Sequence, residues 1–187
     1  MSAYAKLIKF TFLIALLTAV GQMTQTMYVP AIGQMANEFA VTPGSLQAVM
    51  ACYLIPYGLS QFIYGPISDR LGRKPIILFG LAVYMLGTLA ALFAPSYMWF
   101  LAGSFIQGLG VGCGGAMART LGRDRYDGPE LHKVNSLISM SIVFSPLLAP
   151  LLGGLLAENF GWRSSYLFLA LFGMAVIITM MTGFKET

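Results

Sequence analysis

The charged sequence Gly65–Lys74 carries most of the chain's visible chemistry. It combines one carboxylate, three cations and two glycines. The glycines allow backbones to approach closely, and a carboxylate suits a helix N-terminus or a cation. A merely basic turn would need the cations alone, so we expect the carboxylate to have a structural partner. The residues of this charged signature are Gly65, Asp69, Arg70, Gly72, Arg73 and Lys74.

Two stripes of polar side chains form a second candidate site. Their spacing of three or four residues puts each stripe on one face of a helix. Unpaired amides facing lipid would cost a few kcal/mol each, so the stripes should face protein or a water-filled cavity. Phenol rings and amides suit flat, lipophilic and often cationic molecules, although tyrosine stripes also serve plain packing. The stripes are Tyr53, Tyr57, Gln61 and Tyr64, and Thr18, Gln22 and Gln25.

Other chemistry is poorly supported. The single histidine, His132, falls in an expected loop, and both cysteines fall in apolar runs, so no metal cluster is expected. Gly110–Gly115 matches G-x-G-x-x-G, but it lies inside an apolar run without a preceding strand. We interpret it as a helix-packing surface. The chain is expected to be no enzyme, to need no cofactor or metal, and to bind no nucleic acid.

The elements that position these residues are membrane-spanning helices. The chain of 187 residues is 57% hydrophobic and only 10% charged, with a mean hydropathy of +0.75. A crossing needs about 20 apolar residues, so the length fits six spans with short loops. The sequence predicts an all-α integral membrane protein. The expected spans are residues 7–31, 45–67, 75–95, 97–119, 134–157 and 163–183.

The distribution of basic residues predicts the orientation of these spans. Six alternating spans place ten of the eleven lysines and arginines on one side, and only Arg163 on the other. By the positive-inside rule both termini then face the cytoplasm. The ten are Lys6, Lys9, Arg70, Arg73, Lys74, Arg119, Arg123, Arg125, Lys133 and Lys185.

An internal repeat refines the expected architecture. A shift of 89 residues superposes the glycines, acid and base of the charged signature on Gly154, Glu158, Gly161 and Arg163. One copy follows the second span and the other follows the fifth, so the repeat unit contains three spans and the second copy is inverted. We expect one six-helix bundle over residues 1–187, built as a 3+3 inverted repeat of about 1–95 and 96–187.

The charged signature resembles the loop between the second and third helices of the major facilitator superfamily. A further element, Pro150, Gly153 and Gly154, resembles the antiporter motif of that family, although Ser145 and Ala149 stand where glycines are usual. Prolines and small residues there favour a bend and close helix packing. The resemblance covers the chain as the N-terminal six helices of a twelve-helix fold.

Within that family the chain is most similar to the drug:proton antiporter group. The resemblance implies a multi-pass protein of the bacterial inner membrane that exports lipophilic or cationic drugs by proton antiport. Its expected partners are the lipid bilayer, hydrophobic small molecules, protons, and a missing C-terminal half or a second copy. The residues expected to line its substrate cavity are Gln22, Gln25, Tyr28, Tyr53, Tyr57, Gln61 and Gln107.

Energy coupling has the weakest support in the sequence. All seven acids lie at span ends or in loops, and Ser104 stands where the family often carries an arginine. Arg119 lies deeper than the loop cations and is a candidate gate or substrate contact. Two alternatives stay open: a half-size chain that works as a homodimeric carrier, and a scaffold that transports nothing.

Overall fold

The computed structural model describes residues 3–184, and this part is helical, without strands. Six helices have at least 20 residues, and a short 3-10 turn and one short helix separate the first two of them. The elements are α1 (Ala3–Thr26), η1 (Val29–Ala31), α2 (Ile32–Phe39), α3 (Gln47–Leu71), α4 (Arg73–Leu92), α5 (Tyr97–Arg125), α6 (Gly128–Phe160) and α7 (Arg163–Gly183).

The predicted all-helical membrane fold is confirmed, with differences in the lengths of its helices. Five helical segments are long and apolar enough to cross a membrane. Helix α3 is not among them, because its tyrosines, its prolines and Gln61 lower its hydropathy, although it has 25 residues. The first span was predicted to end near residue 31. Helix α1 ends earlier, at Thr26, and Pro30, which has no N–H to donate, lies in the short turn η1 that follows. The helical segment then continues as α2 to Phe39. Helices α5 and α6 also extend about six residues beyond their predicted spans, toward the connection between them.

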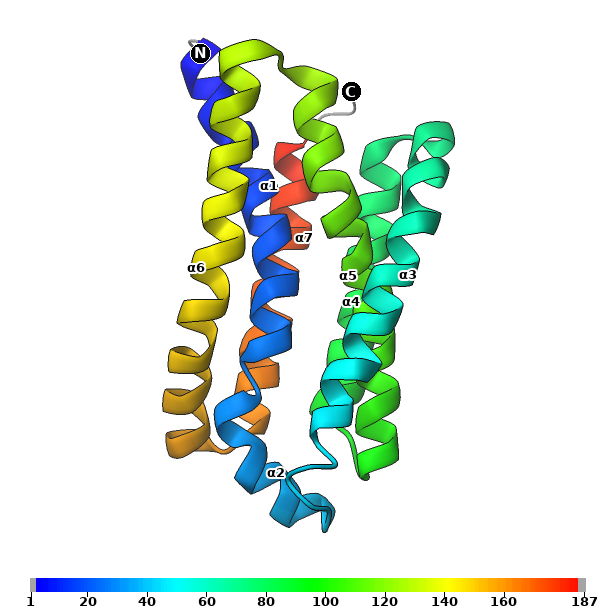
Figure 1. Cartoon of the computed structure of the whole chain (residues 1–187), viewed down its shortest axis with the longest axis vertical. Coiled ribbons are helices and arrows are strands. Elements are labelled where there is room, and N and C mark those ends of the chain that lie inside the picture. The colour runs from blue at the N-terminus through cyan, green and yellow to red at the C-terminus, as the bar shows by residue number, and fades with distance from the viewer. Residues whose placement is uncertain (1–2, 185–187) are drawn as a thin grey trace.

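The helices run side by side and alternate in direction (Figure 1). Both ends of the described chain, the α3–α4 turn and the α5–α6 connection lie at one end of the bundle, which we call the terminal end. Helix α2 and the connections 93–96 and 161–162 lie at the opposite end. The signature cations and those of the α5–α6 connection therefore gather at the terminal end, while Arg163 lies at the other. Lys185 falls outside the described residues.

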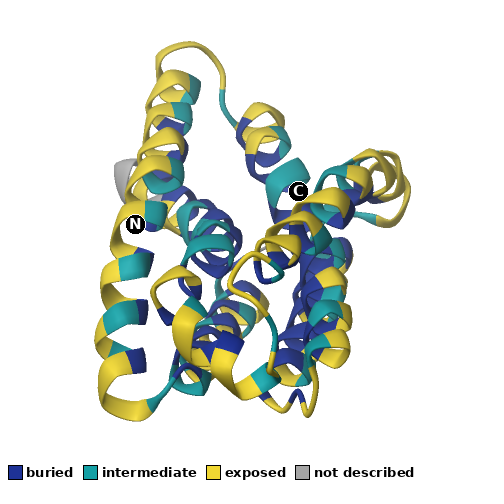
Figure 2. Ribbon diagram, turned by 60° about the horizontal axis from the view of Figure 1, so that its bottom comes forward, coloured by how far each residue is buried: buried dark blue, intermediate teal, exposed yellow. Residues whose placement is uncertain are grey.

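Helix pairing exchanges neighbours between the two expected repeats. Helix α5, the first of the second repeat, packs against α3 and α4, whereas α1 packs against α6 and α7. In Figure 1 these form two groups of three helices, and Figure 2 shows that buried residues concentrate on their inward faces. Such an exchange would interlock the two expected repeats.

Glycines of α5 explain why its neighbours approach so closely. A Cβ atom on Gly108 would collide with the Tyr53 carbonyl of α3, and one on Gly112 with Ser60 of the same helix. A Cβ on Gly110 would collide with the backbone of Tyr84 in α4. The predicted packing role is confirmed, because these glycines lie inside a continuous helix and face other helices.

The turns after α3 and α6 share one backbone conformation. Gly72 has φ 94° and ψ 156°, and Gly161, 89 residues later, has φ 79° and ψ 164°. Positive φ favours glycine, because a side chain would be strained there. Two turns of equal geometry at equivalent positions are what a 3+3 repeat requires.

The basic residue after each turn binds the end of a helix in the other repeat. Lys74 donates from Nζ to the carbonyls of Met181 and Phe184 at the end of α7, at 2.8 Å each. Arg163 donates to the carbonyls of Leu92 and Ala94 at the end of α4, at 3.2 Å each. Helix ends leave carbonyls without helical partners, so each cation satisfies groups that the other repeat leaves open. We call this arrangement the reciprocal cap.

Candidate functional site

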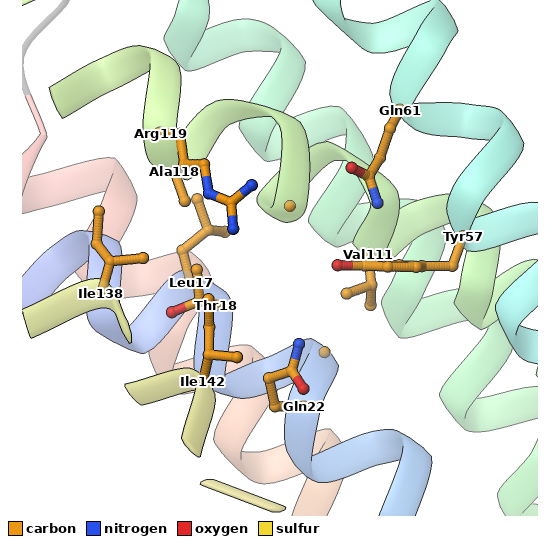
Figure 3. Close-up of a pocket in the computed structure, with 12 residues that line it drawn as sticks. Leu17, Thr18, Gln22, Tyr57, Gln61, Val111, Ala118, Arg119, Ile138 and Ile142 are labelled. Atoms are coloured by element: carbon orange, nitrogen blue, oxygen red, sulfur yellow. The ribbon is translucent and has the colours of Figure 1, made fainter. Parts of the chain in front are cut away.

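A polar pocket of about 90 Å³ lies between α1, α3, α5 and α6. Its polar lining comes from the predicted stripes and from α5, and Figure 3 shows these side chains pointing toward a common space. Leu17, Val111, Ala118, Ile138 and Ile142 form its apolar wall. The polar side chains of the lining are Thr18, Gln22, Tyr57, Gln61 and Arg119.

Neighbouring side chains hold the pocket's amides and ring in place. Gln25 donates from Nε2 to Oε1 of Gln22 at 2.7 Å, which leaves the Gln22 amide nitrogen toward the pocket. The Tyr57 ring stacks on Tyr53, with 6.1 Å between ring centroids and 9° between planes. Tyr53 in turn donates to the carbonyl of Gly21 at 2.8 Å and so joins α3 to α1. The pocket therefore presents an aromatic face and amide groups from two helices.

Arg119 supplies the formal charge of this pocket. No carboxylate is among its lining residues, and the described residues contain no group of three or more His, Cys, Asp or Glu that could hold a metal ion. A guanidinium with an aromatic face and two amides can orient a small amphipathic molecule.

Four of the seven predicted cavity residues lie outside the pocket lining. Tyr53 is 4% exposed, and its hydroxyl donates to the Gly21 carbonyl. Tyr28 is buried in an apolar cluster near α2. Gln107 is 1% exposed and donates to Thr88 Oγ1 at 3.0 Å, between α5 and α4. Gln25 does not line the pocket, but its side chain donates a hydrogen bond to Gln22, which does. The pocket thus brings three of the seven together, because helical periodicity fixes a face and does not name the neighbour, and a wider cavity lined by all seven stays a prediction.

Sequence reasoning missed the apolar half of the pocket. Ile138 and Ile142 of α6 lie one turn apart, and Leu17 of α1 faces them. In a membrane helix an apolar residue gives no signal, since such residues also face lipid and core. Only the position of α6 beside α1 distinguishes them.

The charged signature forms a compact ionic joint. Arg73 contacts Asp69 at 2.6 Å, Asp124 of α5 at 3.0 Å and the Ser68 hydroxyl at 2.5 Å. The structure thus pairs Asp69 with a cation, one of the two partners expected for it. Asp69 is 62% exposed, whereas the Arg73 side chain is only 14% exposed. The joint fixes the start of α4 against the end of α5.

Two members of the signature make no close contact of the expected kind. A Cβ atom on Gly65 would meet nothing within 4 Å, so the close backbone approach expected there is absent from the described chain. Arg70 is exposed at the end of α3 and forms no ion pair among the described residues. The contacts of the signature are therefore concentrated in its second half.

The second sequence motif packs against the break after α1. A Cβ atom on Gly153 would collide with the Met27 carbonyl, and one on Gly154 would lie 3.6 Å from Pro30. Helix α6 continues through Pro150 without interruption. The small residues of the motif thus permit the expected close packing, and the bend expected at its prolines stays a prediction.

At the end of the bundle opposite the ionic joint, Arg163 joins α2, the end of α4 and the turn before α7. Besides its bonds to the end of α4, it pairs with Glu38 of α2 and lies over the Trp162 ring, 4.4 Å from the centroid. The Trp162 indole donates to the other Glu38 oxygen at 2.6 Å. This cluster was not foreseen, because Glu38 and Arg163 are 125 residues apart.

The helical bundle with its central polar pocket has the same fold as solved membrane transporters. A solved structure of a D-xylose-proton symporter aligns with a TM-score of 0.82 at 14% identity, covering 96% of this chain and 48% of the symporter. A peptide transporter structure aligns with a TM-score of 0.81 at 18% identity, covering 92% of this chain and 37% of its own. These likenesses show the fold alone.

The model of the Major Facilitator Superfamily matches residues 14–187, and the chain belongs to that superfamily. Multidrug resistance protein D of Escherichia coli K12 is 49% identical over 180 residues, which are 96% of this chain and 46% of that protein. Multidrug resistance protein MdtL of Escherichia coli O81 is 33% identical, over 86% of this chain and 41% of that protein. The chain thus spans less than half the length of these relatives.

Proposed function

We propose that the chain is the N-terminal half of a multidrug efflux transporter that exports lipophilic molecules by proton antiport. The central pocket is the observation that carries this proposal. Its stacked tyrosine, its amides and its isoleucine wall suit flat apolar molecules of varied shape. The identity to two multidrug resistance proteins supports the same substrate class.

The proposed mechanism is alternating access between two six-helix bundles. In such carriers, substrate sites lie where repeated helices meet, near the middle of the membrane. The pocket lies between α1, α3, α5 and α6, where helices of both expected repeats meet, and it is small in this half alone, so a second bundle would enlarge it. We propose that both termini face the cytoplasm of a bacterial inner membrane, because the basic residues gather at the terminal end.

The positive charge of the pocket favours neutral lipophilic substrates over cationic ones. Arg119 contributes a positive charge and the lining has no acid. Cationic drugs would therefore need an acid from the other half, whereas neutral lipophilic molecules would not. The proposed coupling proton likewise needs a titratable group that the lining of this half does not supply.

A chimaera tests the proposal. This chain replaces the N-terminal half of Multidrug resistance protein D, and dye accumulation is measured in cells that lack other exporters. The expected result is a lower dye level that a protonophore restores. The Gln22→Leu and Tyr57→Leu chimaeras should lose export while inserting normally, and Lys133→Gln, at an exposed position of α6, serves as a surface control. Normal membrane levels of the chimaera without dye movement would contradict the proposal.

The alternatives of a half-size carrier and a scaffold are separated by native size. A lone chain that forms a stable pair and exports dye would favour the carrier, and one that stays single without export would favour the scaffold. Family membership favours the transporter over the scaffold.

A further inference from the structure

A second cavity opens between α5 and α6 at the terminal end of the bundle. It has a volume of about 280 Å³ and shares Arg119 and Ile138 with the central pocket. Arg119 and Arg123 lie four residues apart, on one face of α5. Asn135 and Ser139 lie opposite them on α6, also four residues apart. We call it the arginine cavity.

The cations of this cavity are not neutralised by neighbouring acids. Asp124, the nearest acid in sequence, pairs with Arg73 of the ionic joint. Among the described residues, neither Arg119 nor Arg123 takes part in an ion pair. By contrast, Arg125 lies over the Phe10 ring, 5.0 Å from its centroid. Two guanidinium groups beside an open cavity create a positive potential that attracts an anion.

The donor groups of the cavity suit an oxyanion. A guanidinium presents N–H groups in a planar fork that matches the oxygens of a phosphate. The Asn135 amide and the Ser139 hydroxyl add donors from the facing helix. An oxyanion held between α5 and α6 would be contacted from both sides.

The depth of the arginines points to the level of lipid headgroups. Arg119 lies 22 residues after Tyr97, the first residue of α5, which corresponds to about 33 Å at 1.5 Å per residue. The hydrocarbon core is about 30 Å thick, so Arg119 reaches the membrane surface and Arg123 extends about one turn beyond it. Basic pockets between membrane helices at this level bind anionic headgroups.

We propose that the arginine cavity binds a phosphate-type oxyanion through Arg119 and Arg123. The anion comes either from the headgroup of an anionic phospholipid or from free phosphate. Because the site joins α5 to α6, its occupation stabilises the contact between these helices. The site shares Arg119 with the central pocket, so its test measures lipid binding and not export.

Native mass spectrometry of the purified chain in detergent tests the site. Phosphatidylglycerol and phosphatidylcholine are the two lipid probes. The wild-type chain should retain phosphatidylglycerol about tenfold more tightly than phosphatidylcholine. Arg119→Gln and Arg123→Gln should each weaken phosphatidylglycerol binding about tenfold, because each removes a charged hydrogen-bond donor. Lys133→Gln removes the same charge from the start of α6, outside the cavity, and should change binding less than twofold.

Inorganic phosphate distinguishes the two sources of the anion. Displacement of phosphatidylglycerol by millimolar phosphate from the wild-type chain supports a site for free anions. Retention of the lipid against phosphate supports a headgroup site. Equal retention of both lipids by the wild-type chain would overturn the proposal, and so would an equal loss in Lys133→Gln and the arginine variants.

Two further variants keep the test independent of folding. Arg119→Lys keeps the charge but lacks the planar fork, so its binding should fall between wild type and Arg119→Gln. Ser139→Phe leaves the charge unchanged and fills the cavity, so it should weaken binding as Arg119→Gln does. Thermal unfolding of each variant without added lipid measures its stability separately. Full lipid binding by a folded Ser139→Phe would exclude the cavity as the site.

Discussion

Arg73 connects three parts of the chain through a single side chain. It contacts Asp69 and Ser68 of α3 and Asp124 of α5, and it begins α4. Because the guanidinium is mostly buried while its acids are more exposed, removing it would leave polar groups that water can partly solvate. Its loss should therefore loosen the joint without unfolding the bundle.

Arg73→Ala should lower the free energy of unfolding by about 1–2 kcal/mol, since charged hydrogen bonds contribute about 1.5–3 kcal/mol and solvent screens part of this. The measurement is denaturant unfolding in detergent micelles. Arg70→Ala is the control, because Arg70 is exposed at the same turn, and it should change stability by less than about 0.5 kcal/mol. Equal losses in the two variants would contradict the ionic joint.

Two glutamines of the same predicted site should behave differently. Gln107→Leu removes a buried hydrogen bond to Thr88 and should cost about 0.6–1.7 kcal/mol of stability in a membrane protein. Gln22→Leu alters the pocket and should leave stability nearly unchanged while it weakens the binding of a fluorescent lipophilic dye. Unfolding curves measure the stability of both variants, and dye titrations measure their affinity for the dye. Similar dye affinities in the two variants would contradict the pocket assignment.

At the scale of elements, the helices of the bundle pack with unequal tightness. Helix α5 is enclosed by α3, α4 and α1, and its glycines meet their backbones. Most of α6, in contrast, remains exposed apart from its sides toward α1, η1, α5 and α7. In a bilayer that exposed surface is free for lipid or for another bundle.

Replacement of Gly112 tests the close contact of α5 with α3. Gly112→Ala forces a methyl group into Ser60 and should cost about 1–3 kcal/mol through overpacking. Gly58→Ala, on α3 itself, meets nothing within 4 Å and should be neutral or stabilise the helix by up to about 1 kcal/mol. The check is the apparent melting temperature of each variant in one detergent. A stable Gly112→Ala protein would show that α3 can move away freely.

The elements were largely foreseeable, whereas their partners were not. Runs of apolar residues located all six long helices, and Gly72 marked a real turn because few other residues tolerate its positive φ. Gln107, which was expected to line the substrate cavity, instead donates to Thr88 of α4. Its neighbour depended on α4 lying beside α5, a relation that is set by packing between helices and has no local signal. For the same reason the ion pair between Glu38 and Arg163 could not be predicted from the sequence.

At the scale of the whole molecule, the two turns and the reciprocal cap relate the halves of the chain. If the repeats are equivalent, Gly72→Ala and Gly161→Ala should each cost about 1–2 kcal/mol, because each places a side chain at positive φ. Gly128→Ala, at φ 54° outside the repeat pattern, is the comparison for plain strain. Unfolding free energies should show additive losses for the distant pair Gly72 and Gly161. A large loss at only one of them would argue against equivalent turns.

The reciprocal cap also dictates an order of events during synthesis. The end of α4 leaves the ribosome before Arg163, which lies 71 residues later than Leu92 and donates to its carbonyl. The partner of Lys74 is synthesised later still, because the carbonyl of Phe184 lies 110 residues downstream. The first three long helices therefore enter the membrane as an open half whose closure comes with the last one. Nascent chains arrested before α7 should be cut by protease in the 93–96 connection, and chains arrested well beyond α7 should resist.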